Sequence, residues 1–210
     1  MSQSQRVRPP KRQRPAELVA LMVPTHSGLR VSHKAFWNLC RFNRDLRLER
    51  TARGELIVMT PAGTESSGRN ALLTMRLGIW TEADGSGKFF DSSAGYTLPN
   101  GATRAPDASW ILWERWNALA SEKREKFAPI CPDFVVELQS PSDTRTEVRK
   151  KMAEYLEQGA RLGWLIDPQT CQVEIYRPGR SVEALDHPTT LSGEDVLPGF
   201  VLDLKGILFD

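Results

Sequence analysis

Three polar side chains occur in or beside segments whose other residues are typical of buried strands. Glu137 and Gln139 lie two residues apart in the segment FVVELQ. Since side chains of a strand alternate between its two faces, these two point the same way, while Val136 and Leu138 point to the other face. Asp107 follows a proline and directly precedes the apolar segment ASWIL. Burying an unpaired carboxylate is unfavourable, so the pattern predicts that another group holds these acids.

A metal ion is one group that would hold both acids. Asp107 and Glu137 belong to predicted neighbouring strands, and two carboxylates that meet at a sheet edge repel each other unless a divalent cation lies between them. Magnesium takes oxygen ligands, often one or two carboxylates together with water and a substrate phosphate. Lys151, on the helix predicted to follow, can steady or deprotonate an attacking water, or bind phosphate.

Simpler interpretations of the same residues stay open. Glu137 can be a structural acid that accepts hydrogen bonds from an arginine or from backbone amides. Lys151 lies four residues after Glu147, the spacing of an ordinary helix salt bridge. Its position beside Val148 and Tyr155 also allows the ammonium group to reach over the apolar face of the helix.

Four segments resemble the PD-(D/E)xK restriction-endonuclease-like superfamily, and within it a restriction endonuclease family long catalogued as a domain of unknown function. They run almost continuously from about residue 45 to the end of the chain: ELIVMTP, APDASWI, PDFVVELQSPSD and KMAEYLEQGARLGWLIDPQTCQVEIYRPG. The resemblance implies an α/β fold with a four-stranded mixed sheet flanked by helices. It also implies a magnesium site at one edge of that sheet, which manganese could also occupy.

The resemblance further implies roles for single residues. Asp107 and Glu137 would bind the metal, with the backbone carbonyl of Leu138 as a further ligand. The superfamily usually has a lysine two residues after the acid, where this chain has Gln139. The family is similar to cases in which the lysine has moved to the following helix, where Lys151 lies.

Glu65 matches the position from which the superfamily often supplies another acidic metal ligand. It lies near the start of a predicted helix. An acid in the first turn of a helix is also favoured by the helix dipole alone, so both interpretations stay open.

The elements that must position these residues are indicated by periodicity, caps and turn residues. Residues 31–43 predict a short helix capped by Ser32, and residues 46–59 predict a β-hairpin. A longer helix follows, with an apolar stripe of Leu72, Met75, Ile79 and Trp80. Further predicted elements are strands at 88–91, 95–98, 106–113 and 134–138, a helix at 144–159, a strand–turn–strand unit at 162–178, and a loop with a short edge strand at 191–204.

The order of these elements predicts one α/β domain over residues 31–210, a mixed sheet flanked by helices with an N-terminal helix and hairpin extension. Residues 1–30 form a basic tail before it. Residues 1–14 carry five positive charges and no acid, so the remainder is near −3 in a chain of net charge +2. Such a tail is either a solvated terminus or an arm that touches nucleic-acid phosphates.

Several other classes of protein are excluded by what the sequence lacks. It has no GxSxG motif of a serine hydrolase, and its three cysteines and three histidines form no CxxC or HExxH pattern. No apolar run is long enough for a bilayer, and the basic start has no apolar region of a secretory signal. We therefore expect a cytoplasmic protein that is not inserted in a membrane.

The function implied by the resemblance is metal-dependent endonuclease activity, the hydrolysis of phosphodiester bonds in DNA. Because cutting both strands of a duplex is simplest for a two-fold dimer, we expect a homodimer. An alternative is a nuclease-fold protein that binds nucleic acid or a protein partner without cutting, which Gln139 and the mildly acidic body favour. Hydrolysis of other phosphate esters would use the same metal site.

Overall fold

The computed structural model describes residues 26–59 and 61–209 of the 210-residue chain. Residues 1–14, whose charge suggests a solvated tail or a nucleic-acid arm, lie outside the described residues. The helices are α1 (His33–Phe42), α2 (Thr64–Asp84), α3 (Trp113–Asn117), α4 (Ser121–Arg124) and α5 (Arg145–Glu157). The strands are β1 (His26–Arg30), β2 (Arg47–Arg50), β3 (Glu55–Met59), β4 (Gly87–Asp91), β5 (Tyr96–Thr97), β6 (Thr103–Arg104), β7 (Ala108–Leu112), β8 (Phe134–Leu138), β9 (Leu162–Asp167), β10 (Gln172–Tyr176), β11 (Glu183–Asp186), β12 (Thr190–Ser192) and β13 (Val201–Asp203).

A six-stranded sheet forms the centre of the molecule, in the order β11-β10-β9-β8-β7-β4. The pair β8 and β9 is parallel, and the other four pairs of this sheet are antiparallel. The predicted mixed sheet flanked by helices is therefore confirmed. It is larger than the four strands expected, because it has six strands and β4 and β11 lie at its two edges.

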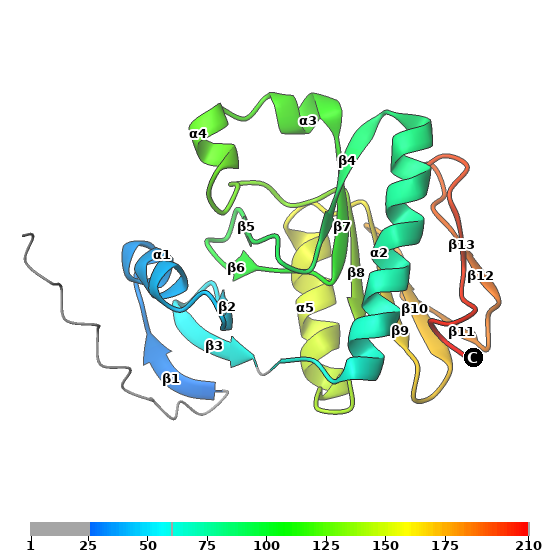
Figure 1. Cartoon of the computed structure of the whole chain (residues 1–210), viewed down its shortest axis with the longest axis horizontal. Helices are drawn as coiled ribbons and strands as arrows, with labels where there is room; N and C mark the ends of the chain where they lie inside the picture. Colours follow the sequence, from blue (N-terminus) through cyan, green and yellow to red (C-terminus); the bar gives the residue numbers. More distant parts are fainter. Residues whose placement is uncertain (1–25, 60, 210) are drawn as a thin grey trace, which may run out of the picture.

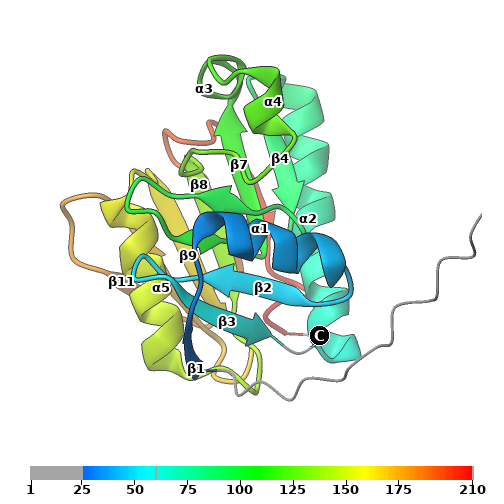
Figure 2. The same ribbon diagram turned by 90° about the vertical axis from the view of Figure 1, so that its left-hand side faces the viewer.

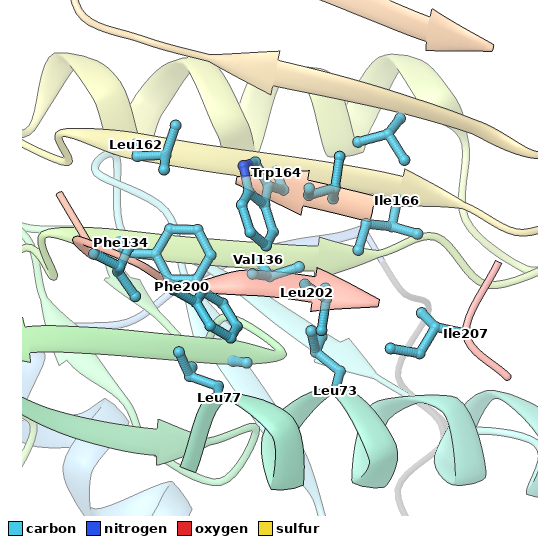
Figure 3. Packing of buried hydrophobic residues seen from close by; sticks show 14 of the residues in the cluster. Leu73, Leu77, Phe134, Val136, Leu162, Trp164, Ile166, Phe200, Leu202 and Ile207 are labelled. Atoms are coloured by element: carbon cyan, nitrogen blue, oxygen red, sulfur yellow. The ribbon is translucent and has the colours of Figure 1, made fainter. Parts of the chain in front are cut away.

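Helices cover both faces of this sheet (Figure 1). On one face α2 and the ribbon β12–β13 pack against alternate residues of the central strands, among them Val136 and Trp164 (Figure 3). On the other face α5 packs through Met152 and Tyr155 on the residues of opposite parity, such as Val135. The alternation of side chains along β8 thus divides the interior into two apolar cores.

The inward face of α2 agrees only in part with the predicted stripe, of which Leu72 and Trp80 pack against the core. Leu73 and Leu77 are fully buried, whereas Met75 and Ile79 are 51% and 65% exposed. The helix spacing fits both sets of residues, because each places apolar side chains three or four positions apart. The pair Leu73 and Leu77 faces the sheet, where it meets the side chains of β8, β9 and β13 (Figure 3).

A second sheet, in the order β1-β3-β2-β6-β5, lies with α1 beyond α5 (Figures 1 and 2). Its hairpin β2–β3 is the one predicted from residues 46–59. Ser32 caps α1 as expected and accepts a hydrogen bond from the amide of Ala35. Residues 26–30, which the sequence pattern assigns to the basic tail, form β1 and pair with β3.

Within residues 26–59 and 61–209, no helix combines the length and the apolar character that a membrane-spanning helix needs.

Candidate active site

The two acids singled out in the sequence lie side by side at the ends of neighbouring strands. Glu137 points to the α5 face of β8, since Val136 and Leu138 belong to the core on the other face. Asp107 directly precedes β7, and its amide donates to the carbonyl of Val136 at 3.0 Å. Its carboxylate Oδ2 in turn accepts a hydrogen bond of 2.8 Å from the amide of Leu138. The backbone of β8 therefore holds Asp107 next to Glu137.

Lys151 reaches this pair from α5. Its Nζ lies 2.8 Å from Oε1 of Glu137 and 2.8 Å from Oε1 of Glu49. It also donates to the carbonyl of Ala105 at 3.3 Å. Of the positions open from the sequence, the structure shows the one in which the ammonium group reaches over the helix face. All three of its donors then have an acceptor.

Glu49 is a site residue that the sequence reasoning missed. It lies on β2, in the N-terminal sheet, and is only 2% exposed. Besides Lys151, its carboxylate accepts from the guanidinium of Arg104 and the amide of Ala105, each at 3.0 Å. One signal was present: Glu49 and Arg47 lie two residues apart, so they share one face of a strand that also carries apolar residues.

Further contacts tie α5 to these groups. The hydroxyl of Tyr155 donates to Oε1 of Glu137 at 3.1 Å. Arg104 also pairs with Glu154 of α5 at 2.6 Å. Asn100 donates to the second oxygen of Glu154 at 2.9 Å. The N-terminal sheet, α5 and the central sheet are thus joined through one buried polar network.

The charges of this network are not balanced at Glu137. Burial, together with the negative charges of Asp107 and Glu49, raises the pKa of Glu137 to about 8, although Lys151 opposes the shift. Burial also raises the pKa of Asp107 above its usual range. Near neutral pH Glu137 therefore holds a proton, and a cation placed beside it would displace that proton.

The pKa values of Lys151 and Glu49 shift in the directions that keep both groups charged. Although burial opposes it, the carboxylates of Glu137, Glu49 and Asp107 raise the pKa of Lys151. Burial alone would raise the pKa of Glu49, but Lys151 and Arg104 outweigh it and the pKa is lowered. Lys151 and Glu49 are consequently a charged pair at every pH at which the protein would work.

The remaining predicted site residues lie in different surroundings. Gln139 follows β8, and its side-chain oxygen is buried without a hydrogen-bond partner among the described residues. Leu138 is buried, and its amide is taken by Asp107. Glu65 is 78% exposed at the side chain and pairs with Arg69 of the same helix at 3.2 Å. No contact given by the described residues joins Glu65 to the carboxylate cluster.

Arg47 is a second residue that the sequence did not indicate. Its guanidinium lies 3.6 Å from Oδ1 of Asp107 and donates to the carbonyl of Ser92 at 3.2 Å. The arginine side chain is 36% exposed, so it connects the buried acids with the surface. A partly exposed arginine beside two carboxylates is suited to hold an anionic substrate group.

The donor set fits a divalent cation. Asp107 and Glu137 supply carboxylate oxygens, and the raised pKa of Glu137 reflects the excess of negative charge around it. The side-chain oxygen of Gln139, two residues after Glu137, is buried without a hydrogen-bond partner among the described residues. Within the described residues, no group of three or more His, Cys, Asp or Glu side chains has the geometry of a metal site. The protein side chains therefore offer two carboxylates, the number typical of magnesium sites completed by water and phosphate.

Comparison with known proteins gives a matching family model and several similar solved structures. The model of a family described as "Uma2: Putative restriction endonuclease" matches residues 34–205. Among solved structures, the chain is similar to "a putative nuclease belonging to DUF820" from Anabaena variabilis, with 24% identity and a TM-score of 0.66 over 77% of this chain and 89% of that one. At this identity the second match shows the fold alone. No curated protein matches the sequence.

Proposed function

Because the chain belongs to the family described as "Putative restriction endonuclease", we propose that it is a magnesium-dependent endonuclease that hydrolyses phosphodiester bonds in DNA. The family that the sequence motifs resemble is thereby confirmed, while the activity is our proposal. The observation that carries it is the cluster of Asp107, Glu137 and Lys151 at adjoining strand ends. Manganese would serve in place of magnesium.

In this proposal each residue of the cluster has a distinct role. Asp107 and Glu137 hold the cation, with the carbonyl of Leu138 and the side-chain oxygen of Gln139 as further oxygen donors. Glu65 stays a candidate only for an additional, weaker contact, because it already pairs with Arg69. When bound, a divalent cation polarises the phosphate and lowers the pKa of a coordinated water.

Lys151 and its partners lie where the attacking water would approach the phosphate. The ammonium group is fixed by Glu49 and Ala105, and its third contact is with Glu137, beside which the attacking water would approach. Its raised pKa keeps it charged, and it therefore orients water and stabilises negative charge rather than removing a proton. Glu137, whose pKa is about 8 without a metal, would give up its proton when it binds the cation.

Arg47 would act on the substrate. Its guanidinium lies at the exposed border of the site, 3.6 Å from Asp107. A phosphate that approached the acids would meet this guanidinium, which can donate two parallel hydrogen bonds to phosphate oxygens. This contact would offset the repulsion between the phosphate and the two carboxylates.

The test is DNA cleavage with and without magnesium. Glu137→Gln keeps the size of the side chain but removes the charge, so it should lower the magnesium-dependent rate by at least about 100-fold. Glu174→Gln is the matched control: Glu174 is also buried, and both glutamates are register partners of Leu165 on β9. The control should keep the wild-type rate.

A non-cutting nucleic-acid or partner-binding protein is the second candidate, favoured by Gln139 in the usual lysine position. It predicts that wild type binds DNA but shows no cleavage with magnesium or manganese, and that magnesium leaves its thermal unfolding unchanged.

Under the nuclease proposal, cutting both strands of a duplex calls for a homodimer. Sedimentation should then give twice the chain mass of 23.6 kDa.

A further inference from the structure

Residues 41–45, the end of α1 and the turn that follows it, form an exposed surface that combines an aromatic ring with two arginines. We call this segment the α1–β2 turn. Phe42, the last residue of α1, is 82% exposed, more than any other large apolar side chain of the described residues. Arg41 and Arg44 stand on either side of it and are exposed as well. A single acid, Asp45, lies in the same turn.

The two arginines of this turn are not engaged elsewhere. Within residues 26–59 and 61–209, neither guanidinium makes an ion pair or a hydrogen bond with another side chain. Most other arginines near the site are paired, as Arg104 is with Glu49. Two unpaired arginines beside an exposed aromatic ring are the combination that single-stranded nucleic-acid surfaces use, because arginine contacts phosphate and the ring stacks on a base.

The turn is connected to the candidate active site by its own chain. It leads directly into Arg47, which lies 3.6 Å from Asp107. Phe42 is five residues before Arg47, so their Cα atoms are at most about 17 Å apart. A strand whose scissile phosphate reached Arg47 would place a neighbouring nucleotide within reach of Phe42. Figure 2 shows α1 and β2 next to each other on the face turned to the viewer.

Charge favours nucleic acid over other partners at this turn. Residues 26–59, which form α1 and strands β1 to β3, contain seven lysines and arginines against three acids, whereas residues 60–210 contain sixteen against twenty-two. The groove of about 820 Å³ along α2 is also partly apolar, but its lining includes Glu82 and Asp91 and no lysine or arginine. A polyanion would therefore approach the N-terminal sheet rather than α2.

We propose that the α1–β2 turn grips the nucleic-acid substrate, with Phe42 stacked on an unpaired base and Arg41 and Arg44 on the adjoining phosphates. This inference rests on the proposed nuclease function and specifies how the substrate is held. A base displaced from its stack beside the cutting site would be the partner of Phe42.

The experiment measures binding of a fluorescein-labelled oligonucleotide, single-stranded and duplex, in EDTA, and single-turnover cleavage with magnesium. Phe42→Ala should weaken binding about 5- to 100-fold. Phe42→Tyr should bind as wild type does, because it keeps the ring. Phe42→Leu should resemble Phe42→Ala, because it keeps apolar volume without a face for stacking. Since Phe42 is exposed, all three variants should fold, which thermal unfolding checks.

The arginines are tested by the salt dependence of binding. Arg41→Gln and Arg44→Gln should each reduce the slope of log affinity against log salt by about 0.7–0.9. Arg180→Gln should leave the slope unchanged. Arg180 is an exposed arginine in the hairpin between β10 and β11, the edge strand of the central sheet, and lies outside the N-terminal sheet. Ile79→Ala, which removes another exposed apolar side chain, should leave binding unchanged.

Each outcome decides between the two proposals. A wild type that cuts DNA, with binding and cleavage unaffected by Phe42→Ala, would overturn the gripping turn and leave the nuclease function standing. Wild-type behaviour of Phe42→Leu would indicate an apolar docking surface for a protein, and would also overturn it. A wild type that neither binds nor cuts would overturn both.

Discussion

At the scale of single residues, one ammonium group contacts carboxyl groups from two different sheets. Lys151 lies 2.8 Å from both Glu137 and Glu49, and its side chain is 15% exposed. Removing one partner of a buried ion pair leaves the other charge without compensation. Lys151 is therefore important for stability as well as for the proposed chemistry. It would not be important for stability if it only formed an exposed helix salt bridge with Glu147.

Lys151→Met should lower the free energy of unfolding by about 3–5 kcal/mol, because Glu49 would remain buried without its main partner. Adding Glu49→Gln should restore part of this loss, with a coupling of about 0.5–3 kcal/mol. Urea unfolding of the two single variants and the double variant measures it. Additive effects would contradict the direct pairing of Lys151 with Glu49.

The raised pKa of Glu137 predicts how stability depends on pH in the metal-free protein. Between the unfolded value of about 4.5 and the folded value of about 8, the folded state holds more protons than the unfolded state. Stability from this group is therefore full below pH 4.5 and is lost as the pH rises through 8. The loss is at most about 5 kcal/mol, since one pKa unit corresponds to about 1.4 kcal/mol.

Thermal unfolding in EDTA at pH 5.5 and pH 8.5 would measure this loss. Glu137→Gln cannot ionise, so its stability should fall less between the two pH values than that of wild type. Equal falls in both proteins would show that Glu137 does not titrate in this range.

The sequence revealed only part of the site. Glu137 and Asp107 were predictable because a carboxylate in an apolar strand needs a partner. Glu49 and Arg47 were not, because a short polar strand such as RLER is equally typical of a solvated hairpin. Their role depends on the N-terminal sheet lying against α5, a long-range contact that no local pattern specifies.

At the scale of elements, α5 covers two buried glutamates that differ in their partners. Glu174 on β10 accepts hydrogen bonds from Tyr176 at 2.6 Å and from Arg145 and Arg149 of α5. Although burial opposes it, the hydrogen bonds from Arg149, Tyr176 and Arg145 lower the pKa of Glu174 to about 2. Glu174 is therefore a charged group that fastens α5 to the sheet, whereas Glu137 is an acid with a surplus of negative charge around it.

Glu174→Gln should lower the free energy of unfolding by about 1–3 kcal/mol at pH 7, because hydrogen bonds to a charged acceptor are lost. The contribution of Glu174 is present above pH 4.5 and is lost as the pH falls through 2. The variant should thus approach wild-type stability in acid, as measured by urea unfolding from pH 2 to pH 7. A constant difference at all pH values would contradict the charged fastening.

Local sequence patterns predicted where helices and strands lie better than they predicted which face of an element is buried. Ser32 as a cap and the hairpin of residues 46–59 were predicted and are present. The inward face of α2 was predicted only in part. Leu72 and Trp80 pack against the core, but packing against the sheet also buries Leu73 and Leu77 and leaves Met75 and Ile79 exposed. For residues 191–204 a loop and one short edge strand were predicted. The structure has two strands there, β12 and β13, whose apolar residues complete the core under α2.

At the scale of the whole molecule, charge is unevenly distributed: residues 26–59 are basic, whereas residues 60–210 carry an excess of acids. The basic N-terminal sheet lies next to the acidic cluster and contributes Arg47 and Glu49 to it. A substrate that bridged the two would be drawn to the basic side and presented to the acids, where repulsion between carboxylate and phosphate requires a cation. The central claim is therefore that Asp107 and Glu137 bind a divalent metal.

The most direct test is a crystal of the protein soaked in manganese, with diffraction collected where manganese scatters anomalously. The account predicts an anomalous peak between the carboxylates of Asp107 and Glu137, at roughly 2.0–2.6 Å from their oxygens. The peak should be absent in Glu137→Gln crystals and present in Glu174→Gln crystals. A wild-type crystal without a peak there, with Lys151 still paired to Glu137, would contradict the account.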